Sequence, residues 1–462
     1  MGRYTKRLGP LGLVCFFLIF SETAFGQDQS ASGARVISPD EAVEMAVKNN
    51  LGLESSRVSV ETKKRKSDLS WNRFIPSVTL GGSLVMDNKA ATVTIPATPF
   101  SPASSIEASR WHIAGSIQAS LSISAALFEG IRNLRLDYEG GLISYDKARA
   151  HLERDIRKAY YQMLLIRENI DLLRESYATA QRQVAMAQAN YRAGLVPELT
   201  LLQARVSMEN LKPSIDQAEN GLKLSMASFA NDLGLPLDIQ FELIPLGEKI
   251  LFIPLDTAEL IARAASNRPD ILELQQNIRL LQSARKAQML SLTPSLTLSW
   301  NTNQAFTQNP WKDDWGNKDF WQQSGALSLS LGIQLHSLIP FSTNFQGIKD
   351  LDDNIRTAHI GLAQTIRGTE LEIYNTVMSL EHARTTVEAL TLTVELAERT
   401  YRLTEEAYRA GLREVLEVQN AELELRKARI GVLEQNFNYL KGLIDLEYAI
   451  GVPFGTLSGS QL

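Results

Sequence analysis

Residues 113–125 read Ile-Ala-Gly-Ser-Ile-Gln-Ala-Ser-Leu-Ser-Ile-Ser-Ala, and this alternation decides the fold. The odd positions are apolar residues or glycine, whereas the even positions from 116 onward are serine or glutamine. Successive side chains of a strand point to opposite faces of a sheet. The segment therefore predicts a strand with one apolar face and one face of small uncharged polar side chains, which suit the lining of a wide aqueous lumen.

Three other segments of the chain alternate in the same way. We expect strands at residues 74–86, 111–126, 292–302 and 322–336, with external loops at 87–110 and 303–321. Segments of about ten residues with this pattern are typical of transmembrane β-barrels, and the alternative is a β-sandwich with one face in a core. The six tryptophans favour the barrel, because tryptophan gathers at membrane–water boundaries and all of them lie in or beside these segments. They are Trp71, Trp111, Trp300, Trp311, Trp315 and Trp321.

An internal repeat organises the rest of the chain. The sequence Tyr-Arg-Ala-Gly-Leu at 191–195 recurs at 408–412, and Ile-Pro-Ser-Val-Thr-Leu at 75–80 is matched, at nearly the same offset, by Thr-Pro-Ser-Leu-Thr-Leu at 293–298. We therefore predict two copies of one plan: helix, strand, loop, strand and long helical hairpin. The first repeat is expected at 27–236, with its helical hairpin at 129–233. A connector, which is a candidate equatorial segment, follows at 237–256. The second repeat is expected at 257–462, with its helical hairpin at 344–450 and then a tail.

Long helices are the second predicted component. No proline occurs at 129–192 or at 341–410, and apolar side chains recur there every seven residues, as at Ile366, Ile373 and Leu380. At 1.5 Å per residue, about 64 helical residues extend roughly 95 Å, which requires a coiled coil or a long hollow bundle.

Four strands per chain cannot close a barrel. An open sheet edge in lipid would leave backbone groups unpaired at a cost of several kcal/mol each, so the chain is expected to oligomerise before it inserts. Two copies would leave little or no aqueous lumen, whereas three copies would give twelve strands and a usable one.

The whole mature chain resembles the outer-membrane efflux proteins typified by TolC. The resemblance rests on the duplicated plan, on Leu127-Phe128-Glu129-Gly130 at the end of a strand, and on the paired Tyr-Arg-Ala-Gly-Leu turns. It implies a mixed α/β membrane protein: a homotrimer with a twelve-strand barrel in outer-membrane lipid that continues into a periplasmic α-helical tunnel.

The same resemblance implies a function and partners. Such a channel is an exit duct for efflux or type I secretion, which acts with a periplasmic adaptor (a membrane fusion protein) at its hairpin tips and with an inner-membrane pump. Members commonly have aspartate six residues after the turn glycine, where this chain has Thr200 and Glu417.

Two candidate sites follow at the hairpin tips. Arg413, Glu417 and Asn420 have the spacing of one helix face, and the resemblance implies that the tunnel narrows here; with Thr200 they form the candidate periplasmic gate. The alternative is a solvated surface pair. The four turn residues Gly194, Leu195, Gly411 and Leu412 are the candidate adaptor contact, for which turn geometry alone would explain the glycines but not two exposed leucines.

Enzymatic chemistry is not expected. The five histidines are scattered, and no metalloprotease, nucleophile-elbow or phosphate-loop motif occurs, so we predict no catalytic residue, cofactor or metal. The net charge of −5 gives no reason to expect nucleic acid. Cys15, the only cysteine, lies in a predicted signal peptide at residues 1–26, so the mature chain is expected to lack disulfides.

Two other functions remain as alternatives. A stand-alone passive porin would need the barrel but not the long helices, and a soluble coiled-coil scaffold would need the helices but not the alternating strands. The exit duct accounts for both components. The transported substrate cannot be read from the sequence.

Overall fold

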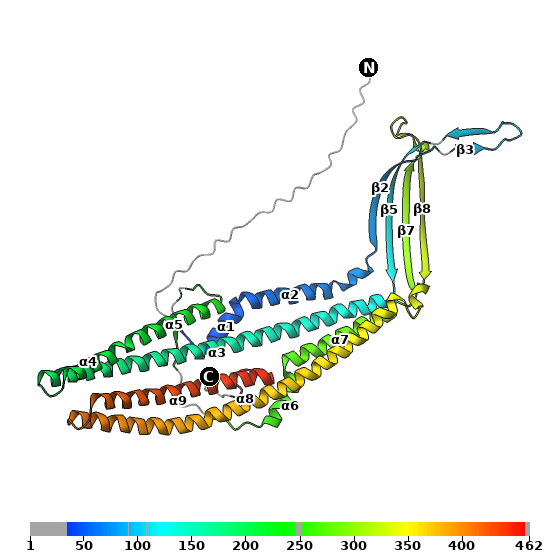
Figure 1. The fold of residues 1–462 in the computed structure, drawn as a ribbon. Helices are drawn as coiled ribbons and strands as arrows, with labels where there is room; N and C mark the ends of the chain where they lie inside the picture. Colours follow the sequence, from blue (N-terminus) through cyan, green and yellow to red (C-terminus); the bar gives the residue numbers. More distant parts are fainter. Residues whose placement is uncertain are drawn as a thin grey trace, which may run out of the picture.

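The computed structural model describes residues 35–457 apart from Ala91, Ala108, Asp238, Gln240 and 246–251. The predicted signal peptide lies outside the described residues. The described chain is elongated: a four-stranded sheet stands at one end of a long layer of helices, and both helical hairpins turn at the opposite end (Figure 1). A sheet continued by long helices, in two repeats, confirms the predicted fold class.

The sheet is antiparallel throughout, in the order β2-β5-β7-β8. Its strands are β2 (Ser77–Met86), β5 (Trp111–Ile123), β7 (Ser295–Phe306) and β8 (Trp321–Gly332). β2 and β8 form its two open edges. These are the edges that a barrel must close.

The strand register sorts the side chains by polarity. Leu121 lies opposite Leu298, which lies opposite Leu329, so all three point to one face. That face is not a core, since 66% of Leu329 is exposed in the single chain. The other face carries hydroxyls that bond across strands, with 2.8 Å between the Oγ atoms of Ser77 and Ser120.

The strand boundaries differ from the sequence-based ones at both ends. β2 and β7 each begin three residues later than expected, at Ser77 and Ser295, and β8 begins one residue earlier, at Trp321. Three strand ends are displaced as well. β5 ends at Ile123 and the next helix begins at Ala125, because Ser124 is the extended N-cap residue of that helix. β7 continues to Phe306, where the ladder with β8 persists although the polarity no longer alternates. β8 stops at Gly332, since Leu335–Leu338 forms a short 3-10 helix.

The first external loop contains a small hairpin of its own. Its strands are β3 (Thr92–Ile95) and β4 (Ser104–Glu107), which pair only with each other among the described residues. In Figure 1 this hairpin projects from the far end of the sheet.

Each repeat has one very long helix that leaves the sheet. α3 (Ala125–Arg192) has 68 residues and α8 (Thr343–Arg409) has 67. In the first repeat the chain returns through two helices, α4 (Glu198–Glu209) and α5 (Leu211–Asp232), whereas α9 (Val415–Ile450) returns unbroken. The break has a local cause, because Pro213 has no N–H with which to bond the carbonyl of Glu209.

Shorter helices precede the sheet in both repeats. They are α1 (Pro39–Asn49) and α2 (Leu51–Asp68), and then α6 (Thr257–Asn267) and α7 (Pro269–Leu290). β1 (Arg35–Ile37) pairs in parallel with β6 (Phe241–Leu243), so part of the predicted connector is joined to the start of the described chain. None of the described helices has both the length and the apolar character needed to cross a bilayer.

Two glycines at equivalent positions fix the ends of the returning helices. Gly234 has φ +69° and Gly451 has φ +68°. A Cβ atom at either position would lie 2.5 Å from a carbonyl oxygen, that of Asn49 in the first repeat and that of Asn267 in the second. Both repeats thus close by the same backbone contact, which only glycine permits.

Arginine substitutions on the two sheet faces should have opposite consequences. Leu121→Arg or Leu329→Arg should cost about 2–4 kcal/mol near the bilayer midplane, because that face carries the apolar rows. Ser120→Arg or Ser328→Arg should insert normally and shift ion selectivity in planar bilayers. Equal insertion yields for the two pairs of variants would contradict the assignment of the faces.

Candidate functional site

The tips of the two helical hairpins have the same backbone geometry. Gly194 has φ +73° and Gly411 has φ +75°, the left-handed conformation that ends a helix. The N–H of the following leucine donates to the carbonyl five residues earlier in each tip, at 2.9 Å for Leu195 to Asn190 and 2.9 Å for Leu412 to Ala407. The geometry of the turn therefore accounts for both glycines.

The leucines of the turns are not needed for that geometry. Leu195 is 74% exposed and Leu412 is 77% exposed. Water surrounds an apolar side chain at both tips of the free chain, which makes each leucine available to a partner. The structure thus places all four predicted turn residues at the same end of the molecule (Figure 1).

The predicted gate residues lie beside the second tip. The guanidinium Nη1 of Arg413 donates to Oε2 of Glu417 at 2.6 Å, and both side chains are about half exposed. α9 begins at Val415, so Arg413 precedes the helix rather than sharing its face as the spacing predicted. Glu417 lies in the first turn of α9, where the helix dipole favours a carboxylate.

The remaining gate candidates are not joined to that pair. Asn420 is exposed on α9, and Thr200 is half-buried in the first turn of α4, where its N–H donates to the carbonyl of Pro197 at 3.1 Å. The two tips therefore differ in charge: an ion pair stands at the second, and uncharged residues occupy the matching positions of the first.

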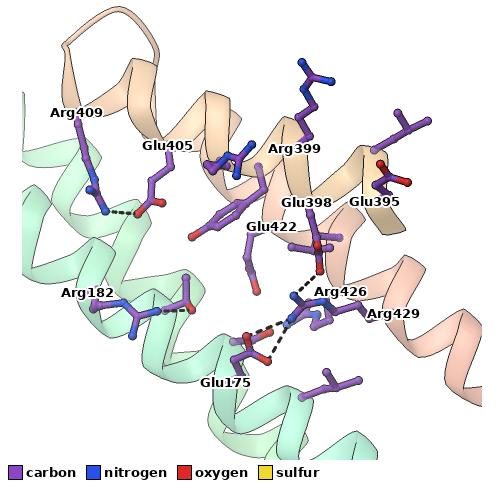
Figure 2. Close-up of a pocket in the computed structure, with 17 residues that line it drawn as sticks. Glu175, Arg182, Glu395, Glu398, Arg399, Glu405, Arg409, Glu422, Arg426 and Arg429 are labelled. Carbon is purple, nitrogen blue, oxygen red and sulfur yellow. Dashed lines mark hydrogen bonds and ion pairs between the residues drawn. The ribbon is translucent and has the colours of Figure 1, made fainter. Parts of the chain in front are cut away.

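A charged groove, which the sequence did not predict, lies between the two hairpins (Figure 2). It has a volume of about 820 Å³ and is lined by α3, α8 and α9. Its charged side chains are six arginines and five glutamates: Arg182, Arg399, Arg402, Arg409, Arg426, Arg429, Glu175, Glu395, Glu398, Glu405 and Glu422.

Arg429 joins the two repeats across this groove. Its Nη1 donates to Oε1 of Glu175 on α3 at 3.1 Å, and its Nη2 donates to Glu398 on α8 at 2.7 Å, as Figure 2 shows. The hydrogen bond to the Glu398 carboxylate raises the pKa of Arg429, because it stabilises the charged guanidinium. Sequence reasoning missed this contact because Arg429 and Glu175 lie 254 residues apart.

No catalytic or metal-binding constellation accompanies these tips. Within the part of the chain that the structure describes, no three metal-ligating side chains come together. The tips thus present exposed apolar turns and one ion pair, and a charged groove lies between the hairpins.

Comparison with known proteins assigns the fold to a family. A family model described as "Outer membrane efflux protein" matches residues 42–234 and, a second time, 260–452. The two matches correspond to the two repeats. None of the curated proteins matches the sequence.

Solved outer-membrane channels have the same fold. The CmeC channel of Campylobacter jejuni superposes with a TM-score of 0.71 at 16% identity, over 89% of this chain and 85% of CmeC. VceC of Vibrio cholerae gives 0.71 at 14% identity, over 90% and 96%. The open state of the MtrE channel of Neisseria gonorrhoeae gives 0.64 at 16% identity, over 90% and 89%.

Loss of the Arg429 link should loosen the hairpins locally. Arg429→Gln removes both ion pairs, which are partly exposed and worth on the order of 1 kcal/mol together, so the amides of α8 near Glu398 should exchange several-fold faster with deuterium. Arg426→Gln is the matched control, because no carboxylate pairs with Arg426 among the described residues. Unchanged exchange in the Arg429 variant would show that the link carries no stability.

Proposed function

The chain belongs to the outer membrane efflux protein family, and we propose that three copies form a gated exit duct that docks a periplasmic adaptor at its hairpin tips. Its place in the bacterial outer membrane and its non-enzymatic transport role follow from the family. The trimer, the docking residues and the gate are the proposal. The observation that carries it is a four-stranded sheet with an apolar face and two open edges.

Closure of the barrel supports three copies. Among the described residues, the four-stranded sheet has β2 and β8 as its two free edges. In lipid, β2 of one chain would pair with β8 of the next, because the unpaired backbone groups of each edge would otherwise cost several kcal/mol apiece. Twelve strands enclose a water-filled lumen, whereas eight are filled by their own side chains. The Ser, Thr and Gln face would then line the lumen.

The long helices support a duct rather than a passive porin. α3 and α8 extend about 100 Å from the sheet at 1.5 Å per residue. A porin needs only its barrel and short periplasmic turns. A tunnel of this length would carry the lumen across the periplasm, toward an inner-membrane pump.

The tips support docking of an adaptor. Leu195 and Leu412 are exposed apolar side chains on rigid turns, so little conformational entropy is lost when they are covered. Six such leucines in a trimer would form an apolar rim, and an adaptor with apolar residues at matching positions would cover it.

The Arg413–Glu417 pair supports a gate. Around a trimer axis, three copies would place alternating charges at the periplasmic mouth, and each arginine could exchange its own carboxylate for that of the neighbouring chain. An exposed pair contributes up to about 1 kcal/mol, so three would favour the closed state by about 3 kcal/mol at most. Adaptor binding of ordinary strength could reverse that balance.

Removal of both turn leucines tests docking. Leu195→Asp with Leu412→Asp should abolish transport while the trimer still forms, because the adaptor loses its apolar contact but the glycines still make the turns. The measurements are crosslinking to the adaptor in membranes and migration of the unheated channel on denaturing gels. Undiminished crosslinking would show that the tips are not the contact.

Removal of the charged pair tests the gate. Arg413→Ala with Glu417→Ala should raise single-channel conductance in planar bilayers and should make cells leak large antibiotics. The matched change of Val196 and Thr200 to alanine should do much less, since those residues cannot form ion pairs. Wild-type conductance of the charged-pair variant would mean that Arg413 and Glu417 form only a surface pair.

A further inference from the structure

The helical layer beside the sheet has two open edges, as the sheet does. α2 packs against α3, α3 against α7 and α7 against α8, so these helices follow one another in the same order as the strands that they adjoin (Figure 1). Among the described residues, α2 and α8 therefore stand at the two edges of the layer. When three copies close the sheet as proposed above, α8 of one chain comes to lie beside α2 of the next.

The open edge of α2 is basic. The run Lys-Lys-Arg-Lys occupies positions 63–66. Lys63 turns inward, and its Nζ donates to Oδ1 of Asp137 on α3 at 2.9 Å. Arg65 lies about 200° further round the helix and so on the opposite face. Within the described chain this exposed guanidinium has no carboxylate partner and donates to Oγ1 of Thr62 on its own helix at 3.3 Å.

The open edge of α8 is acidic. The run Asp-Leu-Asp-Asp occupies positions 350–353. Asp352 turns inward, where its carboxylate pairs with the guanidinium of Arg285 on α7. Asp350 lies about 200° away on the opposite face, exposed and without a basic partner in the part of the chain that the structure describes. The two edges of the layer thus carry opposite charges, each directed away from its own chain.

The internal repeat shows how these edges would align. Phe-Glu-Gly-Ile at 128–131, near the start of α3, is matched by Phe-Gln-Gly-Ile at 345–348, near the start of α8. Thr-Pro-Ser at 293–295, after α7, is matched by Ile-Pro-Ser at 75–77, after α2. α3 therefore corresponds to α8, and α7 corresponds to α2. The contact of α3 with α7 inside the chain is thus the pattern for the contact of α8 with α2 between chains.

That pattern brings the two charged runs to the same height. Inside the chain, the hydroxyl of Ser283 on α7 donates to Oε1 of Glu129 on α3 at 2.9 Å. The counterparts of these two residues are Arg65 on α2 and Gln346 on α8. Asp350 follows Gln346 by about one helical turn on the same face, which is within reach of a long arginine side chain.

The sheet edges align consistently under the same correspondence. The chain pairs Ile117 of β5 with Thr302 of β7, and the equivalent positions in the other two strands are Leu329 of β8 and Leu84 of β2. Both leucines belong to the apolar face. A register wrong by one residue would have opposed an apolar side chain to a lumen-facing one, so the alternation of both edges agrees with the transferred register.

We propose that Arg65 of each chain forms an ion pair with Asp350 of the next chain. The occupant of each edge is a second copy, because the edges have opposite charges and continue the free edges of β2 and β8. Contact between unlike edges closes into a ring, so every copy is bound in the same way. The pair fixes the height of one helical layer against the next. The inference rests on the proposed trimer but not on the gate or the adaptor.

Reversal of the charges tests the pair. Arg65→Glu should lower the temperature at which the unheated trimer dissociates on denaturing gels by several degrees, because a glutamate would face Asp350. Asp350→Arg should do the same, and the double variant should recover most of the loss. Lys66→Glu is the matched control, since it makes the same charge change about 100° away on α2. An equal loss in the control, or no recovery in the double variant, would overturn the pair.

Cysteine crosslinking in outer membranes separates failure of this contact from failure of the trimer. The mature chain is expected to have no cysteine of its own. Arg65→Cys with Asp350→Cys should give covalent dimers and trimers with a short bifunctional thiol reagent. Arg65→Cys with Asp352→Cys should not, because Asp352 faces its own α7. Equal crosslinking of both pairs would contradict the assigned face of α8.

A pair in the strands serves as the reference. Leu84→Cys with Leu329→Cys reports on closure of the barrel alone. If this pair crosslinks and the pair at Arg65 and Asp350 does not, the helical contact is wrong and the trimer stands. If neither pair crosslinks, the proposed trimer is wrong as well.

Discussion

The structure depends on one constraint: in lipid every backbone N–H and C=O of the sheet must have a hydrogen-bond partner. A chain with four strands cannot meet it alone, because the outer sides of β2 and β8 stay open. The same constraint explains the polarity of the strands, since a closed barrel has an outside and an inside. The strands also fix where the long helices start, because α3 begins two residues after β5 ends.

Duplication gives each chain two similar repeats, and the structural differences between the repeats have local causes. Gly234 and Gly451 close both repeats with the same contact, so the C-terminal ends of α1 and α6 are packed in the same way. Towards the tips the symmetry fails. Pro213 divides the returning helix of the first repeat, and only the second tip carries an ion pair. In the proposed trimer, an approximately sixfold tunnel wall would therefore have a threefold distribution of charge.

The sequence was sufficient wherever the deciding interaction is local. Alternation predicted all four main strands, and repeated glycines predicted both tips, because each depends on neighbouring residues. It was insufficient where contacts join distant segments. The ion pair of Arg429 with Glu175 spans both repeats, and the loop of Trp315 turns back onto Phe306 only once the strands have paired. The end of β7 was missed for the same reason, since its last residues remain in the sheet through β8.

Packing becomes weaker from the middle of the molecule to the tips, and this gradient is what the proposed gate would require. Around Tyr160 and Phe229 a large apolar core joins α1, α3, α5 and α9, and a second one surrounds Leu380 and Tyr439. Near the tips the buried clusters shrink to small groups such as Ala187 with Leu201 and Ala204. Near the tips, ion pairs and the charged groove replace apolar clusters as the contacts between helices. Such ion pairs are individually weak and can exchange partners. The middle can therefore stay fixed while the hairpin ends move, because local opening is least costly where apolar burial is least.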